Sequence, residues 1–329
     1  MSFTKQKSQN SNSGRQPNRF VHIFFLDGVG LGSADPQVNP FVSAQMPHTA
    51  GLLGCDDWYT AGNGLLSSER ATLVPTDATL SVSGRPQSAT GQAAILSGRN
   101  VPLLVGEHYG PKPNRAVAEA IQKGTMFSEV AAVGGRAALI TPYPQGYFDA
   151  IDSGKRLYSA VPLAVTNAGW PLFTVDDLRH GRAISPDFTN DGWRDFLGYS
   201  DIEAISAYDA GKRIVTIASD YDLSFFEHWP SDRSGHRGPL SDAVRHLETI
   251  DEAIGGLLAA WPDEQGVLII TSDHGNIEEK NHRQHTRNPV PTILVGKDHL
   301  ELAKQIDDLA DIAGVVRSVL NLEKEVEET

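Results

Sequence analysis

The chain has 329 residues, of which 40% are hydrophobic and 21% are charged. This is an ordinary globular composition, and a chain of this length can bury a sizeable core without disulfides or other staples. The single cysteine, Cys55, excludes a disulfide framework and favours a reducing compartment. The net charge of −13 excludes the basic nucleic-acid-binding proteins, whose affinity comes from Lys and Arg neutralising phosphates. An anionic substrate would need another source of positive charge, and bound metal ions are the obvious one.

The N-terminal residues, MSFTKQKSQNSNSG, lack the apolar segment of a signal peptide. No apolar run reaches the roughly 18–20 residues that cross a bilayer. Residues 1–18 are polar and aperiodic, and they are predicted to form a disordered tail. We therefore expect a cytoplasmic, soluble protein that binds neither membrane nor nucleic acid; the oligomeric state stays open.

The first half of the chain alternates apolar strands with helices. Val21 to Leu26 form a nearly continuous apolar run, which is typical of a strand buried on both faces. A short helix is predicted over 89–97, directly after Ser88, and helices over 115–122 and 126–134 precede the apolar segment 136–143, a predicted strand.

The second half repeats this alternation. Helical spacing of apolar residues predicts an amphipathic helix over 240–261. The other expected elements are strands over 221–229, 266–276 and 290–296 and a closing helix over 307–320. This order predicts an α/β fold with a mostly parallel sheet sandwiched by helices.

The segment between the two halves, 151–206, is rich in Pro, Gly and Asp and has no strong period. It is predicted to be a small cap or a connecting insert. The expected division is a tail over 1–18, a core in two parts over 19–150 and 207–329, and this insert.

Two of the apolar strands end in acidic residues. Asp27 follows one of them directly, and Asp273 with His274 ends the other. Ligands bind at the carboxyl ends of strands in open α/β sheets, so these side chains are expected to meet in one crevice.

Further candidate ligands lie nearby in the sequence. Asp232 and His236 are four residues apart, and His285 lies just ahead of a predicted strand. Mixed carboxylate and imidazole ligands suit Zn or Mn better than Ca or Mg. Six such ligands are too many for one tetrahedral ion and fit a pair of ions that clamps a phosphoryl group. His282, three residues before His285, is an alternative ligand, while the remaining histidines are assigned to the surface or the core.

Each motif alone is weak, since D-x-x-x-H is common by chance, but their joint order along the chain is informative. In this order and content the sequence resembles the alkaline phosphatase superfamily, specifically the metalloenzyme branch that contains cofactor-independent phosphoglycerate mutase and phosphopentomutase. The matching segments are DGVGLG at 27–32, SATGQAAILSGR at 88–99, DRSGHRG at 232–238, TSDHGNIE at 271–278 and HTRNPVP at 285–291.

The resemblance implies an alkaline phosphatase-like core, two divalent metal ions (Mn or Zn) and a serine nucleophile. It implies one ion held by Asp232, His236 and His285, and a second held by Asp27, Asp273 and His274 with the Ser88 oxygen facing it.

The chemistry of Ser88 can also be argued from the residues. A serine hydroxyl is a weak nucleophile until a base or a metal lowers its pKa. At the start of a helix it also lies near free N–H groups and the positive end of the helix dipole, which favour a phosphate. A plain helix cap is the competing interpretation of Ser88, and Thr90 is the alternative nucleophile.

The sequence departs from the mutase pattern in three ways. Gln92 stands where those relatives carry His, the insert is much shorter than the large mutase domain, and the basic substrate clamp is not identifiable. Candidate cations are Arg85, Arg99, Lys112, Arg115 and Arg237.

These features predict a phosphoester hydrolase that acts on a small phosphorylated substrate through a phosphoserine. The alternative is a phosphomutase that returns the phosphoryl group to the same substrate. A sulfatase is disfavoured, because Cys55 lacks the Pro and Arg context for formylglycine, and a non-catalytic metal-binding protein is the remaining alternative.

Overall fold

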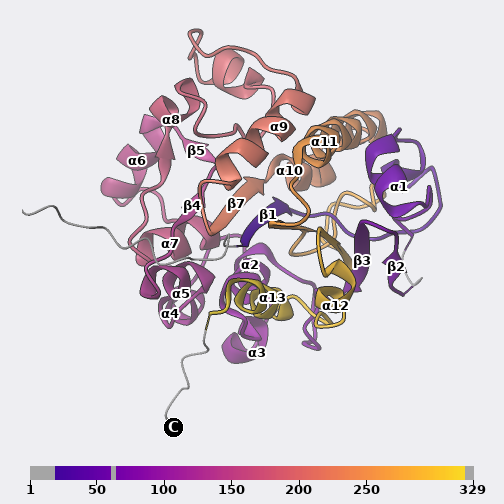
Figure 1. Cartoon of the computed structure of the whole chain (residues 1–329), viewed down its shortest axis with the longest axis horizontal. Helices are drawn as coiled ribbons and strands as arrows, with labels where there is room; N and C mark the ends of the chain where they lie inside the picture. Colours follow the sequence, from indigo (N-terminus) through magenta and orange to yellow (C-terminus); the bar gives the residue numbers. More distant parts are fainter. Residues whose placement is uncertain (1–18, 61–63, 323–329) are drawn as a thin grey trace, which may run out of the picture.

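The computed structural model describes residues 19–60 and 64–322, so the tail expected over 1–18 lies outside the described residues. At its centre is a seven-stranded sheet in the order β2-β3-β9-β8-β1-β7-β4 (Figure 1). Its strands are β1 (Phe20–Leu26), β2 (Leu66–Ser67), β3 (Ala71–Thr76), β4 (Ala137–Leu139), β7 (Leu223–His228), β8 (Gly266–Thr271) and β9 (Val290–Val295).

The sheet is mostly parallel, as the sequence predicts. Strands β8, β1, β7 and β4 pair in parallel, whereas β9 is antiparallel to both β8 and β3, and β2 is antiparallel to β3. Every residue of β1, β7 and β8 is buried, because helices cover both faces of the sheet. The sequence did not predict β2 and β3; Pro75 within β3 weakens the strand pattern there.

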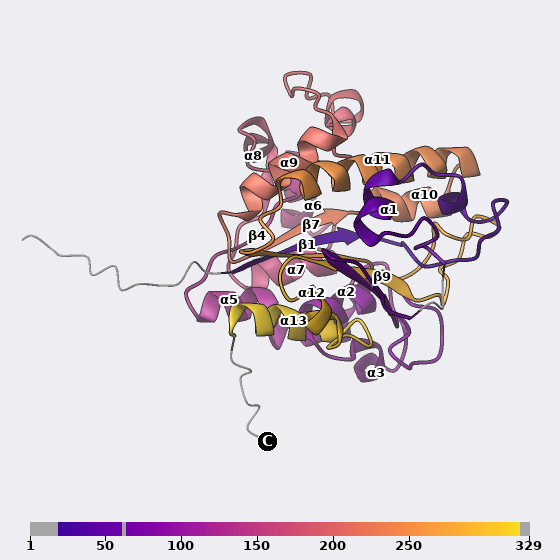
Figure 2. The same ribbon diagram turned by 45° about the vertical axis from the view of Figure 1, so that its right-hand side comes forward.

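One face of the sheet is covered by helices from both halves of the chain (Figure 2). Their apolar residues form a core with Val21, Ile23 and Phe25 of β1. These helices are α2 (Ser88–Ser97), α3 (Val101–Val105), α4 (Arg115–Gln122), α5 (Met126–Ala132), α7 (Ala160–Asn167), α12 (His299–Ala303) and α13 (Asp311–Leu320).

The opposite face packs against the second core, which contains Phe20, Phe24 and Leu26 of β1. The elements on this side are η1 (Pro40–Val42), α1 (Pro47–Leu53), α9 (Ala207–Ala218) and α11 (Leu240–Ala260). The short helix α10 (Pro230–His236) lies between β7 and α11. The amphipathic helix expected over 240–261 therefore matches α11.

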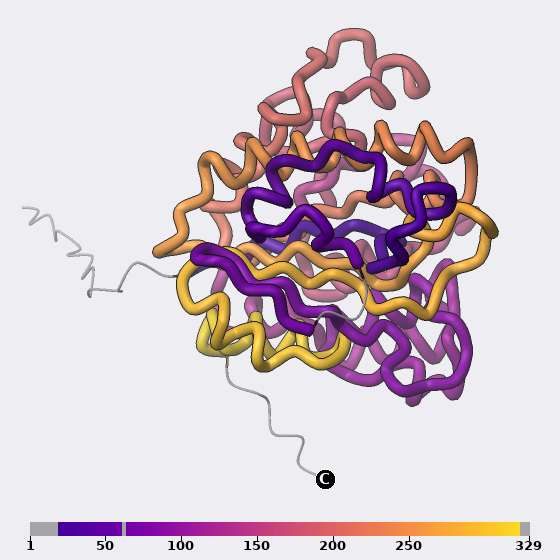
Figure 3. Tube along the Cα trace, turned by 90° about the vertical axis from the view of Figure 1, so that its right-hand side faces the viewer, coloured from indigo at the N-terminus to yellow at the C-terminus, as the bar shows by residue number. Residues whose placement is uncertain are grey.

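The predicted insert contains short elements instead of a single fold of its own. They are α7, β6 (Phe173–Thr174), α8 (Val175–Arg179) and a π-helical turn, η2 (Gly192–Phe196). Just before the insert lie β5 (Pro142–Tyr143), which pairs with β6, and α6 (Gln145–Asp152), which runs into it. In Figure 3 the part of the chain beyond α8 rises above the α9–α11 layer. The insert's predicted boundaries, 151 and 206, remain a prediction, although α6 crosses the first of them and α7 packs into the core.

Within the described residues, no helix is both long enough and apolar enough to cross a membrane.

Candidate metal centre and nucleophile

The ends of two neighbouring strands bring the first group of polar side chains together. Asp27 follows β1 directly, and Asp273 and His274 lie two and three residues beyond β8, its parallel neighbour. The Nε2 of His274 lies 3.3 Å from Asp27 Oδ1 and 3.7 Å from Asp273 Oδ1. All three side chains are buried. The convergence expected from the strand ends is therefore present.

Helix α10 supplies the second group from the other side of β1. Asp232 and His236 are one turn apart, so they lie on the same face of this helix. Gly28, directly after Asp27, has a φ of +71°, and a Cβ there would lie 2.8 Å from Asp232 Oδ1. Glycine at position 28 therefore permits both the turn after β1 and the close approach of α10.

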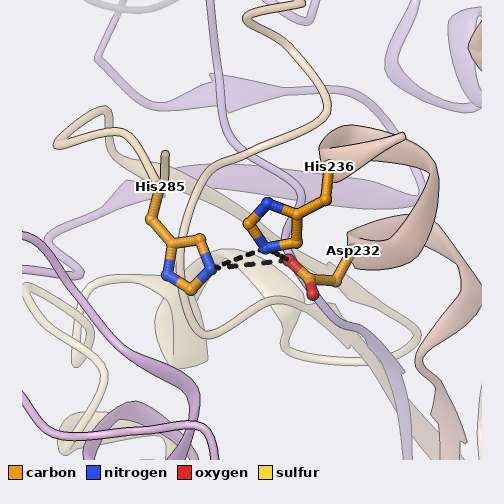
Figure 4. A group of neighbouring side chains, drawn as sticks. All are labelled: Asp232, His236 and His285. Carbon is orange, nitrogen blue, oxygen red and sulfur yellow. Dashed lines mark hydrogen bonds and ion pairs between the residues drawn. The ribbon is translucent and has the colours of Figure 1, made fainter. Parts of the chain in front are cut away.

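His285 completes this second group from the loop before β9 (Figure 4). The Oδ1 of Asp232 lies 3.3 Å from His236 Nε2 and 3.6 Å from His285 Nε2. The Nδ1 of His285 lies 2.9 Å from the carbonyl of Pro86, and that of His236 lies 2.8 Å from the carbonyl of Arg283. A carbonyl can only accept, so each Nδ1 carries a proton, and Nε2 is the ring nitrogen that faces the centre.

Two sets of potential ligand atoms thus form, each with its members within 4.8 Å of one another. One contains Asp232, His236 and His285, and the other contains Asp27, Asp232 and His274. Asp232 belongs to both sets, so it lies at their junction. The resemblance implies Asp273 as a further ligand of the second ion. Its Oδ1 lies 3.7 Å from His274 Nε2, next to the second set.

Ser88 lies next to this second set. It is the first residue of α2, and its Oγ lies 3.0 Å from His274 Nε2. A Cβ on Gly91, one turn along, would lie 2.9 Å from the Asp273 carbonyl oxygen, so α2 packs directly on the turn after β8. The position before α2 is occupied by Gln87, so Ser88 is not the helix cap that the competing interpretation proposed.

The two alternative residues face elsewhere. Thr90 is fully buried, and its Oγ1 accepts from the Tyr109 N–H and lies near the Gln87 carbonyl, which ties a neighbouring loop to α2. His282 pairs with Glu279 at 3.0 Å and belongs to neither ligand set. The geometry thus favours Ser88 over Thr90 and His285 over His282.

Comparisons with known proteins identify related families. Residues 200–324 match the model of the Metalloenzyme superfamily. A 2,3-bisphosphoglycerate-independent phosphoglycerate mutase of Moorella thermoacetica is 31% identical over 137 residues, which are 40% of this chain and 27% of that protein. The corresponding enzyme of Rhodopseudomonas palustris is 36% identical over 115 residues, covering 33% of this chain and 21% of the relative. The chain thus spans about a quarter of the length of these curated relatives.

Solved structures show the same fold at low sequence identity. The PH0037 protein of Pyrococcus horikoshii aligns with 94% of this chain and 98% of its own at a TM-score of 0.52, with 16% identity. A variant alkaline phosphatase of TAB5 aligns with 94% of this chain and 99% of its own at a TM-score of 0.50, with 13% identity. Residues 200–324 thus match the Metalloenzyme superfamily, and the chain has an alkaline phosphatase-like fold. It resembles phosphoglycerate mutase within that superfamily.

The residues of this centre fit bound divalent cations. The Oδ1 of Asp27 and that of Asn276 are buried without a hydrogen-bond partner among the described residues. Buried acceptors without partners are rare and costly, and a cation would satisfy them. Nε2 lone pairs beside carboxylate oxygens are also the donor set that transition-metal ions prefer.

The electrostatics of the metal-free centre lead to the same conclusion. Burial, with the nearby Asp273 charge, raises the pKa of Asp27 well above its ordinary value, and burial raises the pKa of Asp273 to about 7. Burial lowers the pKa of His274 and of His285 to about 4. Both trends reflect the cost of burying a charged group, and a cation would offset it for the carboxylates and bind the neutral imidazoles.

Sequence reasoning missed the residue that connects the ligand-bearing loops. The carboxylate of Glu278 is fully buried and accepts from the N–H groups of Gly30 at 3.0 Å and Asn276 at 2.8 Å. It also accepts from the hydroxyl of Thr286 and, at 3.0 Å, from the amide of Asn288. One carboxylate therefore joins the loops that carry Asp27, His274 and His285. The only signal in the sequence was its place at the end of TSDHGNIE.

Two more supporting contacts come from side chains without an assigned role. The Nε2 of Gln92, which departs from the family pattern, donates to Asp273 Oδ2 at 3.0 Å and so orients that carboxylate. Lys280 Nζ donates to the carbonyls of Ser234, Gly235 and Arg237 and so binds the end of α10.

The predicted cations do not form a cluster at the site. Arg99 donates to the carbonyls of Ala120, Lys123 and Gly124, Arg115 pairs with Glu119 on the exposed face of α4, and Lys112 donates to the carbonyl of Leu157. Arg85 donates to Gln284, and Arg237 is exposed.

Proposed function

We propose that this chain is a two-metal-dependent phosphoester hydrolase that uses Ser88 as its nucleophile. The observation that carries the proposal is the Ser88 oxygen, placed 3.0 Å from His274 at the edge of two ligand sets that share Asp232. Seven side chains would hold the ions, namely Asp27, Ser88, Asp232, His236, Asp273, His274 and His285, and Mn or Zn suits these donors.

The bound ions would supply positive charge to the transferring phosphoryl group and lower the pKa of the Ser88 hydroxyl. Ser88 then attacks phosphorus, its P–O bond forms as the bond to the leaving alkoxide breaks, and a phosphoserine results. Water next attacks the phosphoserine and restores the Ser88 hydroxyl as inorganic phosphate leaves. Free N–H groups in the first turn of α2 favour the phosphate in both steps.

Hydrolysis is preferred to mutase chemistry because of the small cover over the site. A mutase must enclose its substrate and exclude water while the phosphoryl group is held on the enzyme. The described elements between β4 and α9 are short helices and a two-stranded pair. Phosphoglycerate mutase-like or phosphopentomutase-like transfer is the second candidate, which the similarity to phosphoglycerate mutases favours.

The test compares two products with the same enzyme. The chain loaded with Mn or Zn is incubated with a panel of phosphomonoesters and diesters, and inorganic phosphate is measured. Isomerised product is measured from 3-phosphoglycerate and ribose 1-phosphate. We expect phosphate release; clean isomerisation without phosphate release would instead establish the mutase.

A variant tests the nucleophile. Ser88→Ala should lower turnover by at least about 10³-fold, because no other hydroxyl replaces an oxygen nucleophile in the same place. Wild-type enzyme quenched in acid should carry phosphate on the peptide that contains Ser88, as detected by mass spectrometry. Ser97→Ala is the matched control, since Ser97 lies in the same helix and donates only to the Ala93 carbonyl. Turnover by Ser88→Ala equal to that of Ser97→Ala would refute the assignment.

A further inference from the structure

A cavity of about 970 Å³ lies beside the candidate metal centre and has no role in the chemistry described so far. Its wall is formed by the turn after β4, α6, the loop around η2 and the start of α10. We call it the ring cavity and define it by Tyr143, Tyr147, Trp193, Phe196, Trp229 and Arg233, all of which line it.

The ring cavity adjoins the metal centre through shared backbone and a shared helix. His228, which lines the cavity, accepts through its carbonyl oxygen from the Asp27 N–H at 3.0 Å. Trp229, which caps the start of α10, and Arg233 within it line the cavity, and Asp232, the neighbour of Arg233, belongs to the metal centre. The hydroxyl of Tyr143 donates at 3.0 Å to the buried carboxylate of Glu227, the penultimate residue of β7. The cavity and the metal centre thus share helix α10 and the end of β7.

The wall offers rings and positive charge. Phe196 is 88% exposed and Trp229 is 45% exposed, although large apolar side chains normally avoid water. Exposed apolar groups gathered at a concave site are typical of ligand binding. Arg156 lies over the Tyr147 ring at 4.7 Å from its centroid. Arg233 has no hydrogen bond or ion pair to another side chain in the described part of the chain.

Two carboxylates in the wall do not oppose this charge directly. Asp187 accepts from the N–H of Asn190 at 3.1 Å and from that of Gly192, and Asp191 pairs with the Thr189 hydroxyl at 2.8 Å. Both carboxylates are thus occupied in shaping their own loop. In a chain of net charge −13, arginines left without acidic partners beside a cavity indicate recognition of an anion.

We propose that the ring cavity binds the organic group of the phosphorylated substrate and that this group contains a planar ring, as in aryl or nucleoside phosphates. This inference rests on the proposed function. A three-carbon phosphorylated acid would leave most of the cavity unfilled, whereas a ring can stack on the exposed aromatic side chains. Arg233 and Arg156 would contact the phosphate or another anionic group of the same ligand.

The test compares phenyl phosphate, adenosine monophosphate and 3-phosphoglycerate on the metal-loaded chain. We expect kcat/KM for at least one ring-bearing substrate to exceed that for 3-phosphoglycerate by about ten-fold or more, and the ratio between the two ring-bearing substrates distinguishes an aryl from a nucleoside phosphate. Phe196→Ala should raise KM for the preferred substrate by about five-fold or more, the lower range for loss of one stacked ring. Arg233→Gln should also raise it. Leu104→Ala and Arg115→Gln, which change exposed side chains outside the cavity, serve as matched controls.

Two results would overturn the inference while leaving the proposed function intact. One is phosphate release from 3-phosphoglycerate that equals or exceeds release from the ring-bearing substrates. The other is an equal effect of Phe196→Ala on all three substrates. If no phosphoester is turned over, the proposed function fails. A binding measurement then tests separately whether the cavity accepts a ring. Phenyl phosphate should then still quench the fluorescence of Trp193 and Trp229 in a saturable way that Phe196→Ala weakens; no saturable quenching would reject the cavity as a ring site.

Discussion

Two regions of the chain bury titratable side chains, and they do so in opposite ways. At the carboxyl edge of the sheet, carboxylates and imidazoles converge within a few ångströms, and the Asp27 oxygen remains without a partner. On the side of the sheet that faces α9 and α11, buried imidazoles are held one or two at a time. His22 lies beside Ser224. His228 lies beside His246, and the two Nε2 atoms are 3.0 Å apart.

The difference indicates what each region needs in order to be stable. Imidazoles among apolar side chains are tolerated when neutral, and burial accordingly lowers the pKa of His22 to about 3 and of His246 to about 4. A buried carboxylate, by contrast, becomes neutral only by binding a proton. The raised pKa values of Asp27 and Asp273 reflect this tendency. The carboxyl edge therefore requires cations, whereas the α9–α11 side requires only the absence of charge.

The largest expected effect comes from removing the shared ligand at the carboxyl edge. Asp232 belongs to both ligand sets, so Asp232→Asn should lower the bound metal from two ions per chain to less than one. His236 belongs to one set only, so His236→Ala should leave about one ion. Metal content after dialysis, measured by elemental analysis, provides the comparison. Turnover should fall with the metal content, because both ions are proposed to act on the phosphoryl group.

The matched control for this prediction is Asp242→Asn. Asp242 lies in the first turn of α11 and pairs with Arg245, away from both ligand sets. Its variant should retain two ions. Equal metal loss in Asp232→Asn and His236→Ala would show that Asp232 serves a single ion and that the two sets are not joined through it.

A smaller effect is expected from the carboxylate that positions the edge. Glu278→Gln replaces two acceptor oxygens by one acceptor and one donor, so one of the N–H or O–H groups around it would face another donor. We expect metal affinity to fall by about 10- to 100-fold, as for other residues that orient ligands. The free energy of unfolding of the metal-free chain should fall as well, by about 1–3 kcal/mol, and its melting temperature should fall with it.

The neighbouring Glu279→Gln is the control for this change. Glu279 is half-buried and contacts His282 and Asn288, whereas the bond to Gly30 in the loop after β1 is made by Glu278. Titration of each metal-free variant with Mn or Zn, followed by fluorescence or calorimetry, measures the affinity. If Glu278→Gln were to melt earlier but bind metal as tightly as the control, its role would be purely structural.

The carboxyl edge was largely predictable from the sequence because strand ends fix it. Buried apolar runs locate β1 and β8, and the polar residues that follow them must meet where parallel strands end together. His285 was less certain, since a loop delivers it, and its ring is held by the carbonyl of Pro86 and by stacking on His274, neither of which the sequence reveals. Glu278 could not be recognised, because four donors from two connections, the one after β1 and the one between β8 and β9, converge on it only in the folded chain.

The insert was not predictable for a different reason. Its elements are stabilised by contacts to distant parts of the chain, such as Ala160 and Val165 of α7 in the core beside α2. Short elements of this kind have weak periodicity, because tertiary packing rather than local pattern decides them. The cavity wall that includes Trp193 and Phe196 was therefore beyond sequence reasoning, and with it the nature of the substrate.

The smallest expected effect tests the α9–α11 side of the comparison through the acid sensitivity of folding. His22 is fully buried, and burial lowers its pKa from 6.5 in the unfolded chain to about 3 in the native protein. Above pH 6.5 both states are neutral at this residue. Below it the unfolded chain binds a proton that the native chain does not, so stability falls as the pH falls, by up to about 1.4 kcal/mol per pH unit. In His22→Gln this contribution is absent, so the loss of unfolding free energy between pH 7 and pH 5 should be about 2 kcal/mol smaller than in the wild type.

Urea unfolding of both proteins in a chelator measures this difference without interference from metal release. His180→Gln, at an exposed position, should behave as the wild type. An identical pH dependence in His22→Gln and the wild type would show that this imidazole is protonated in the native chain, and the contrast between the two regions would no longer hold.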